Sequence, residues 1–246
     1  MKIDEGRGRP ILVLHAGMGD LGSWAGVTDR LRDRFRTVRL HRRQYRLDVP
    51  RKVTIADEVA EVRAAAAALD RPVLVGHSSG AVVALEALVA DPDLYSVAVL
   101  YEPPVVLGEP LGGEHAARAR AALAEGKPGT AFAIFLREVA KMRSPMIGVA
   151  RFAMNRRASR IGPLVERQWD DNDAIDALGC RLEAYRAIEV PVLLLAGERS
   201  PGHLIERLDA LERALPNATR TTMRGQGHTA ERTAPGRVAA AITAFL

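Results

Sequence analysis

The sequence predicts an α/β fold, with a mostly parallel central sheet, helices on both of its faces and a helical cap insertion. Short apolar runs alternate with helical patterns up to Tyr101 and again from Val190 onwards, which is typical of βαβ units. Between Pro103 and Ile188 every pattern is helical. The 246 residues suit one domain over 1–246, with residues 103–188 inserted in it as the cap.

The elements of the sheet follow one another in regular order. Strands are expected at Met1–Gly6 (a short edge strand), Ile11–His15, Thr37–Leu40, Val73–Val75, Ser96–Tyr101, Val190–Ala196 and Ala218–Met223. Helices are expected between them at Trp24–Phe35, Thr54–Leu69, Ala81–Ala90, His203–Leu215 and Arg237–Leu246. Thr54 suits an N-cap, because Asp57 and Glu58 follow it in the first turn.

The insertion contains five helical patterns and no β-branched run long enough for a strand. They cover Glu114–Glu125, Thr130–Met142, Met146–Ser159, Pro163–Asp170 and Ile175–Ala187. An insertion at the carboxyl edge of a parallel sheet covers the ligand crevice. Its apolar side chains suit a hydrophobic acyl or ring group, but their helical spacing favours packing roles for most of them: Phe132, Phe135, Met142, Met146, Phe152, Met154 and Trp169.

The composition narrows the classes of protein. Apolar residues make up 48% and charged residues 26%, as in ordinary soluble proteins, and no apolar run is long enough to span a membrane. Met1–Gly6 lacks the apolar core of a signal peptide. The single cysteine, Cys180, cannot form an internal disulfide, is expected to be a small core thiol, and fits a reducing compartment. We therefore expect a cytoplasmic protein with no membrane partner.

A net charge of +5 raises the question of nucleic-acid binding. Only four of the 35 basic residues are lysine, the arginines are spread along the chain, and no basic platform with interleaved aromatic residues is evident. A nucleic-acid partner is therefore not expected. The one dense run, Arg36–Lys52, contains seven basic residues against Asp48 alone. It fits either a solvated loop or an anion-attracting loop at the rim of the site, because it follows the strand next to the Val73–Val75 strand.

The most informative stretch surrounds Ser78. Val73–Val75 is followed by Gly76-His77-Ser78-Ser79-Gly80 and then directly by a helical pattern. A serine at such a strand-to-helix corner has a strained backbone that lifts its hydroxyl clear of the sheet. The flanking glycines are needed because strand and helix pass too close for a Cβ. Ser78 is therefore the predicted nucleophile.

Four landmarks together resemble the α/β-hydrolase superfamily over essentially the whole chain. They are the loop His15-Ala16-Gly17-Met18-Gly19, the Gly76–Gly80 corner, the strand ending at Gly197 and the turn Gly225-Gln226-Gly227-His228. The resemblance implies an α/β-hydrolase fold in which His228 is the catalytic base for Ser78. It also implies an oxyanion hole formed by the backbone N–H groups of Gly17 and Ser79, with Met18 as a substitute for Gly17.

The remaining histidines have other expected roles. His77 points away from the corner and is expected to support the structure, and His15 to brace the oxyanion loop. His41, His115 and His203 have no motif context. No cofactor or metal site is expected, because no nucleotide, flavin or metal-ligand spacing occurs.

The acid that orients His228 departs from the superfamily pattern. Related enzymes commonly carry aspartate shortly after the strand that ends here at Gly197, but this chain has Ser200 at that position. Two carboxylates could replace it. Glu102 ends the strand beyond the nucleophile strand, and Glu198 lies early in the loop, next to Arg199. The sequence leaves three options open, namely Glu102, Glu198 or no acid, with Glu102 preferred.

The predicted function is hydrolysis of an ester, thioester or related acyl substrate through an acyl-serine intermediate. The missing aspartate leaves an alternative, a protein of this fold with non-hydrolytic chemistry such as C–C cleavage, lyase, decarboxylase or cyclase steps. A ligand-binding protein without activity is a third option, disfavoured because Ser78 and His228 are both present. The partner is expected to be a small hydrophobic acyl substrate, and the sequence determines neither its identity nor the oligomeric state.

Overall fold

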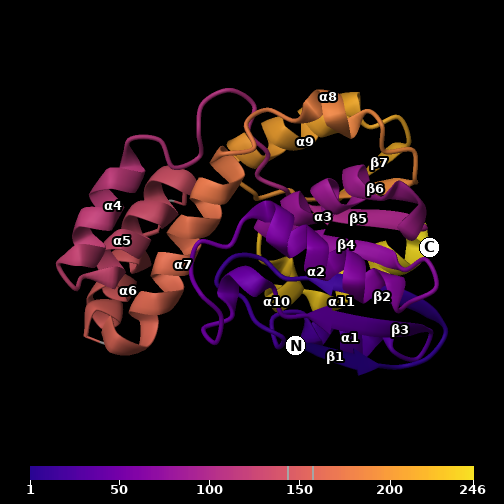
Figure 1. Ribbon diagram of the computed structural model, residues 1–246, viewed down its shortest axis with the longest axis horizontal. Coiled ribbons are helices and arrows are strands. Elements are labelled where there is room, and N and C mark those ends of the chain that lie inside the picture. The colour runs from indigo at the N-terminus through magenta and orange to yellow at the C-terminus, as the bar shows by residue number, and fades with distance from the viewer. Residues whose placement is uncertain (143, 157) are drawn as a thin grey trace.

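The computed structural model describes residues 1–142, 144–156 and 158–246. One sheet of seven strands has the order β1-β3-β2-β4-β5-β6-β7. The strands are β1 (Lys2–Glu5), β2 (Arg9–Leu14), β3 (Phe35–Leu40), β4 (Val73–His77), β5 (Val97–Tyr101), β6 (Val192–Gly197) and β7 (Ala218–Met223). Only β1 is antiparallel to its neighbour, so the predicted mostly parallel sheet is confirmed (Figure 1).

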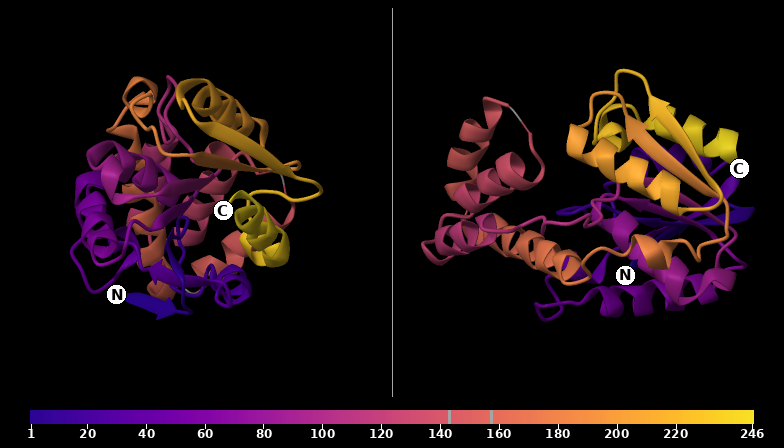
Figure 2. Two further views of the ribbon diagram at one scale, coloured as in Figure 1. Left: turned by 90° about the vertical axis from the view of Figure 1, so that its right-hand side faces the viewer. Right: turned by 90° about the horizontal axis from the view of Figure 1, so that it is seen from above.

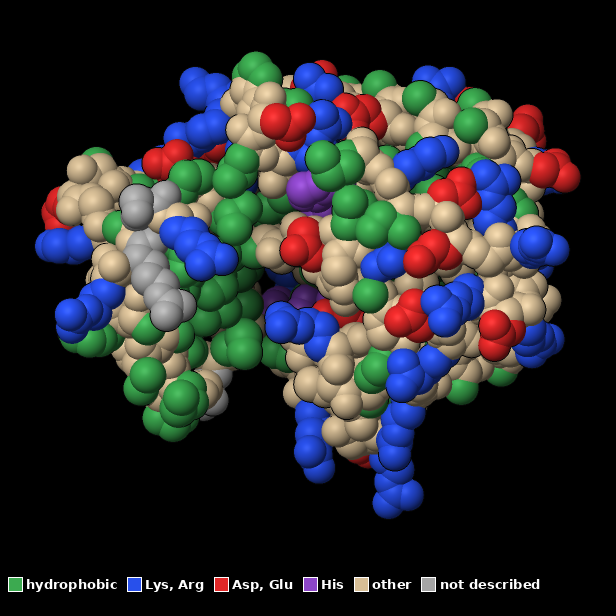
Figure 3. Space-filling view, turned by 90° about the horizontal axis from the view of Figure 1, so that it is seen from below, with side chains coloured by type: hydrophobic (Ala, Val, Ile, Leu, Met, Phe, Trp, Pro, Cys, Tyr) green, Lys and Arg blue, Asp and Glu red, His purple; other side chains and the backbone are tan. Residues whose placement is uncertain are grey.

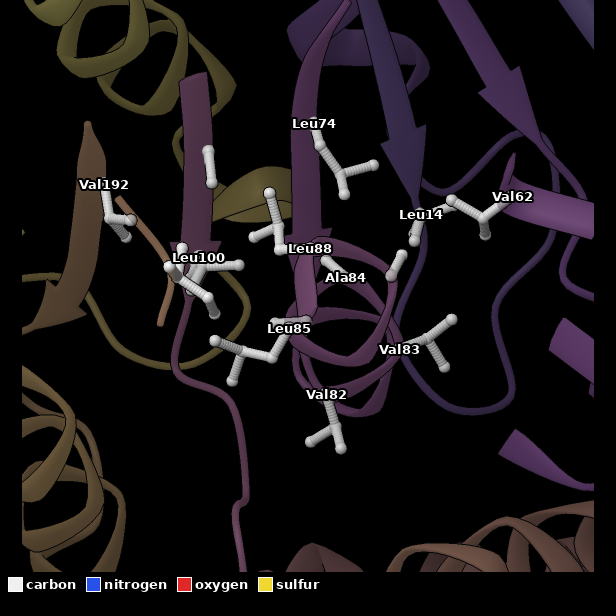
Figure 4. Packing of buried hydrophobic residues seen from close by; sticks show 14 of the residues in the cluster. Leu14, Val62, Leu74, Val82, Val83, Ala84, Leu85, Leu88, Leu100 and Val192 are labelled. Atoms are coloured by element: carbon white, nitrogen blue, oxygen red, sulfur yellow. The ribbon is translucent and has the colours of Figure 1, made fainter. Parts of the chain in front are cut away.

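Helices cover both faces of the sheet, as expected from strands buried on both sides. Leu12 and Leu14 of β2 pack among the helices α2 (Ile55–Ala67), α3 (Ser79–Ala90), α8 (Leu182–Tyr185) and α9 (Gly202–Ala214). Ile11 and Val13, which point to the other face, pack against α1 (Ala25–Leu31) and α11 (Pro235–Phe245). Figure 4 shows the first core, where α3 lies against β4 and β5.

Two element boundaries differ from the predictions, and one predicted helix cap is confirmed. Phe35 begins β3 and does not end the preceding helix, because its side chain is buried against the sheet. Helix α3 starts at Ser79, two residues earlier than expected. The predicted cap of α2 is present: Thr54 Oγ1 accepts a hydrogen bond from Asp57 N, at 3.1 Å.

The inserted segment forms a lobe beside the sheet domain (Figures 1 and 2). It consists of α4 (His115–Ala124), α5 (Pro128–Ile134) with the π-helical η3 (Phe135–Val139), α6 (Met146–Asn155) and α7 (Ala158–Asp176). We call this lobe the cap. Two expectations were wrong: Pro163 lies inside α7 and does not start a helix, and the pattern from Ile175 to Ala187 divides between the end of α7 and the short α8. Residue 157 of the expected Met146–Ser159 helix lies outside the described residues.

The cap has a small apolar core of its own. Trp169 of α7 is fully buried there, among Ala119, Ala122, Ala131 and Val165. Phe135 contacts Trp169 edge-on, and Phe132, Phe135 and Met154 pack around this core. The expected packing role is therefore confirmed for these aromatic residues and for Met154. The other three, Met142, Met146 and Phe152, are exposed.

Two expectations from the composition can also be compared with the structure. Cys180 is exposed and is not a core thiol, because it lies in the loop between α7 and α8. Among the described residues, no helix combines the length and hydropathy that a membrane crossing requires.

Candidate active site

Ser78 occupies a strained corner between β4 and α3. Its backbone has φ 53° and ψ −126°, values that a residue with a side chain rarely adopts. Its N–H donates to the Tyr101 carbonyl at the end of β5, at 2.8 Å. The side chain is partly exposed, whereas His77 and Ser79 on either side are buried. The structure therefore presents the Ser78 hydroxyl at the carboxyl edge of the sheet.

The glycines of this corner are required by close approach. A Cβ on Gly76 would lie 2.5 Å from Ala81 Cα, and one on Gly80 would lie 2.4 Å from the His15 carbonyl oxygen. Both contacts are with backbone, which cannot move aside cheaply. The close approach of β4 and α3 at Gly76 was predicted from the sequence, and the contact of Gly80 with the loop after β2 was not.

Gly80→Ala is expected to destabilise the protein by about 1–3 kcal/mol, because the added methyl group overpacks a backbone contact. Gly148→Ala is the matched control, since a Cβ there meets nothing within 4 Å. Removing a helical glycine should stabilise by about 0.5–1 kcal/mol. Urea unfolding monitored by circular dichroism measures both variants. Equal stability of the two would contradict the packing argument.

His228 and Glu102 form a direct hydrogen bond. His228 Nδ1 and Glu102 Oε2 are 2.6 Å apart, and the other Glu102 oxygen accepts from Gly197 N, also at 2.6 Å. The Glu102 side chain is fully buried and that of His228 is 30% exposed. Glu102 also has a positive φ of 46°, a backbone conformation unusual for glutamate. A carboxylate thus fixes one ring nitrogen of His228, which leaves Nε2 as the proton acceptor.

Glu198, the alternative acid, has a different partner from His228. Glu198 Oε2 accepts a hydrogen bond from Gly225 N at 2.6 Å, so it joins the loop after β6 to the turn that carries His228. The Ser200 hydroxyl is buried without a hydrogen-bond partner in the described part of the chain. Of the three options that the sequence left open, the geometry matches Glu102.

Ser78 and His228 are brought near each other by their neighbours. His77 Nε2 donates to the His228 carbonyl at 2.9 Å, and the two imidazole rings lie 4.9 Å apart. The Tyr101 hydroxyl donates to the Gly227 carbonyl and accepts from Ala230 N. Burial keeps the pKa of His77 well below 6.5, so its ring is neutral. The hydrogen bonds of the described residues do not include one between the Ser78 and His228 side chains.

The loop after β2 lies beside the nucleophile corner. His15 is buried, its Nδ1 donates to the Ala16 carbonyl, and its Nε2 accepts from Arg42 N at 3.1 Å. Burial lowers the pKa of His15 to about 3, so it braces the loop as a neutral ring. A Cβ on Gly17 would lie 2.2 Å from Gln168 Oε1, so this loop packs tightly against α7 of the cap. Met18 follows with a φ of 52°.

Ser79 is linked to a buried ionic cluster that the sequence did not reveal. Arg42 donates to Ser79 Oγ at 2.6 Å, to Glu58 on α2 and to Asp171 on α7. Burial alone would lower the pKa of Arg42, but the carboxylates of Asp171 and Glu58 raise it. Tyr45 donates to Asp171 at 2.8 Å. The cluster connects the start of the nucleophile helix to the cap.

Much of the basic run Arg36–Lys52 is engaged in ion pairs, which neither sequence interpretation anticipated. Arg42 is buried, and Arg51 pairs with Asp170 and Glu166 on α7. Further carboxylates are paired with the arginines at 36, 39, 43 and 46. Two of its arginines, Arg42 and Arg51, thus join the sheet domain to the cap. The acidic residues at 166, 170 and 171 could have indicated these ion pairs in the sequence, since their negative charges complement the basic run.

Glu231 of α10 (Ala230–Thr233) is a second buried acid near the site. It is 5% exposed, and its Oε2 lies 3.9 Å from His77 Nδ1 without a hydrogen-bond partner among the described residues. Burial raises the pKa of Glu231 to about 7 from its usual 4.5. The folded protein therefore binds a proton there that the unfolded chain releases between these two values.

This proton makes stability depend on pH. The contribution of neutral Glu231 is complete below pH 4.5, decreases between pH 4.5 and 7, and is lost above pH 7. Glu231→Gln mimics the neutral form and should be more stable than wild type at pH 8, by up to about 3 kcal/mol, and similar at pH 4.5. Thermal melts across this range test the prediction, with exposed Glu189→Gln as the control. A stability difference that does not change with pH would refute it.

Within the described residues, no three His, Cys, Asp or Glu side chains are grouped so that they could hold a metal ion. The space beside the site is a cleft. In Figure 3 this cleft separates the cap from the rest of the molecule, its cap side is largely hydrophobic, and histidine side chains are visible inside it.

Comparisons with known proteins agree with this architecture. Residues 11–241 match the model of the alpha/beta hydrolase family. An alpha/beta hydrolase from Sphaerobacter thermophilus DSM 20745 has a similar structure, with a TM-score of 0.85, 22% identity, and coverage of 100% of this chain and 95% of that chain. No curated protein sequence gives a significant match.

Two further structures have names that indicate an activity. A thermophilic esterase from Thermogutta terrifontis has a TM-score of 0.76 and 23% identity, with 99% of this chain and 91% of that chain covered. A bromoperoxidase from Bacillus anthracis has a TM-score of 0.76 and 16% identity, with 99% and 94% covered. At these identities the likeness shows the fold alone. Because the family match spans nearly the whole chain and the fold agrees with it, the protein belongs to the alpha/beta hydrolase family.

Proposed function

We propose that the protein is a serine hydrolase that cleaves an ester, thioester or related acyl substrate through an acyl-serine intermediate. The observation that carries the proposal is the hydrogen bond of 2.6 Å between His228 Nδ1 and the buried Glu102 carboxylate, next to a strained serine corner. A serine hydroxyl is a poor nucleophile at neutral pH and needs an oriented, neutral imidazole to accept its proton.

The reaction would proceed in two halves. Ser78 Oγ attacks the substrate carbonyl carbon while His228 Nε2 takes the hydroxyl proton, and the C–O or C–S bond to the leaving group breaks as His228 returns that proton to it. Water then attacks the acyl-serine ester by the same route, releasing the acid and restoring Ser78. Glu102 stabilises the imidazolium that forms in each half.

The negative charge on the carbonyl oxygen needs fixed donors. We assign them to the backbone N–H groups of Gly17 and Ser79, with Met18 N–H as the substitute for Gly17. Hydrogen bonds hold both segments: His15 braces the loop after β2, and Arg42 donates to the Ser79 hydroxyl at the start of α3, at 2.6 Å. The hydrophobic cap side of the cleft in Figure 3 supports a hydrophobic acyl group as the substrate.

Hydrolysis of p-nitrophenyl esters of increasing chain length tests the proposal. We expect turnover above the uncatalysed rate for at least one ester, and preference for a chain longer than acetate. The esterase-named relative supports this choice of substrates. No turnover of any ester or thioester in the panel would contradict the proposal and favour the non-hydrolytic alternative.

A further inference from the structure

The cap carries an exposed apolar surface on and just before α6. Among the described residues, six large hydrophobic side chains are exposed, and four of them lie within eleven residues on or just before α6. They are Met142, Met146, Val149 and Phe152, which are 45%, 62%, 59% and 64% exposed. We call them the α6 surface. Soluble proteins rarely gather exposed apolar side chains in this way unless the surface binds something.

The α6 surface faces away from the rest of the cap. Ile147, on the opposite side of the helix, is buried, and Asn155 Oδ1 accepts from Gly129 N on α5 at 2.7 Å. A Cβ on Gly129 would lie 2.1 Å from the Arg151 carbonyl, so α5 and α6 are in close backbone contact. Met146, Val149 and Phe152 follow one another at a spacing of three residues and share the other side.

The charge of the segment indicates the kind of partner. Residues 139–165 contain six basic residues and no acidic one. Arg151 and Arg156 are exposed, and the Arg156 guanidinium lies over the Phe152 ring at 5.4 Å. A second copy of the chain packed symmetrically on this surface would bring like charges together. A partner that presents negative charges over an apolar layer would complement both the basic residues and the exposed apolar side chains.

We propose that the α6 surface docks on an anionic lipid surface, with the apolar side chains entering the interface and the arginines contacting lipid headgroups. A helix with an exposed apolar side and basic flanks is the usual device for such binding. The proposal replaces the expectation of no membrane partner, which depended on the lack of a spanning segment. It concerns a surface contact and is independent of the proposed function.

Vesicle co-sedimentation tests the proposal. At low salt, the wild-type protein should bind phosphatidylcholine vesicles containing about 30% phosphatidylglycerol at least about tenfold more tightly than pure phosphatidylcholine vesicles. Met146→Ser combined with Phe152→Ser should weaken this binding by at least about tenfold, because two large apolar side chains no longer enter the interface. Both substitutions spare the contacts with α5.

Leu47→Ser is the matched control, because Leu47 is 55% exposed and lies next to Arg46 but is far from α6 in the sequence. It should bind like wild type. Arg151→Gln with Arg156→Gln should remove most of the preference for anionic vesicles. Three results would overturn the proposal: no binding to either vesicle, equal binding to both, or a wild-type dimer in light scattering that the Met146→Ser, Phe152→Ser variant converts to a monomer.

Discussion

Replacing Ser78 with alanine is expected to lower kcat/KM for ester hydrolysis by at least about a thousandfold, because only binding and the oxyanion donors would still act on the transition state. The effect should appear mainly in kcat, since the hydroxyl forms its bond with the substrate only during the reaction. Initial rates on the best p-nitrophenyl ester of the panel measure it. Serine and alanine both carry a Cβ, so the backbone strain at position 78 is similar for both and the variant should keep the fold.

Two controls make this result specific. The melting temperature of Ser78→Ala should stay close to that of wild type. Ser96→Ala removes a hydroxyl that accepts from Arg9 at 3.0 Å, just before β5 and at the opposite edge of the sheet. That variant should keep full activity. Turnover by Ser78→Ala close to wild type would remove Ser78 from the mechanism.

Glu102→Gln is expected to lower kcat/KM by about a hundredfold to ten-thousandfold, because an amide cannot stabilise the His228 imidazolium and can favour the wrong tautomer. The amide is nearly isosteric and can still accept the hydrogen bond from Gly197 N, so the fold should survive. Steady-state kinetics on the same ester measure the loss, and circular dichroism checks the fold.

Glu198→Gln is the matched variant, since it changes an acid of the same type on the neighbouring loop. Glu198 contacts Gly225 N and not the His228 side chain, so we expect a loss of less than about tenfold. A large loss for Glu198→Gln with little change for Glu102→Gln would reverse the assignment. Small effects from both would mean that His228 works without a carboxylate.

The sheet and the nucleophile corner were predictable because local sequence determines them. Strands buried on both faces are continuous apolar runs, and their alternation with helical patterns predicts a parallel sheet. The glycines around Ser78 allow a conformation and a backbone approach that other residues do not, so a motif of five residues located the corner. His228 was located by the turn that follows the last strand.

The acid was harder to predict because it depends on contacts between distant segments. Glu102 and His228 are 126 positions apart, and no local pattern distinguishes a glutamate that ends a strand from one that points into the site. The Arg42 cluster was missed for the same reason, since its partner Asp171 is 129 positions away. From the sequence alone, Arg42 and Asp171 cannot be distinguished from solvated charges, because only the fold brings them into contact.

The most direct test of the account is covalent labelling of the nucleophile. A serine-directed fluorophosphonate needs the same activated hydroxyl and oxyanion donors as an ester, but it forms a stable adduct and requires no knowledge of the substrate. We expect one adduct per chain in the intact mass of the wild-type protein, mapped by peptide analysis to Ser78, and much slower labelling of His228→Ala. No adduct, or an adduct at another residue with Ser78 unmodified, would contradict the claim that Ser78 is the activated nucleophile of this protein.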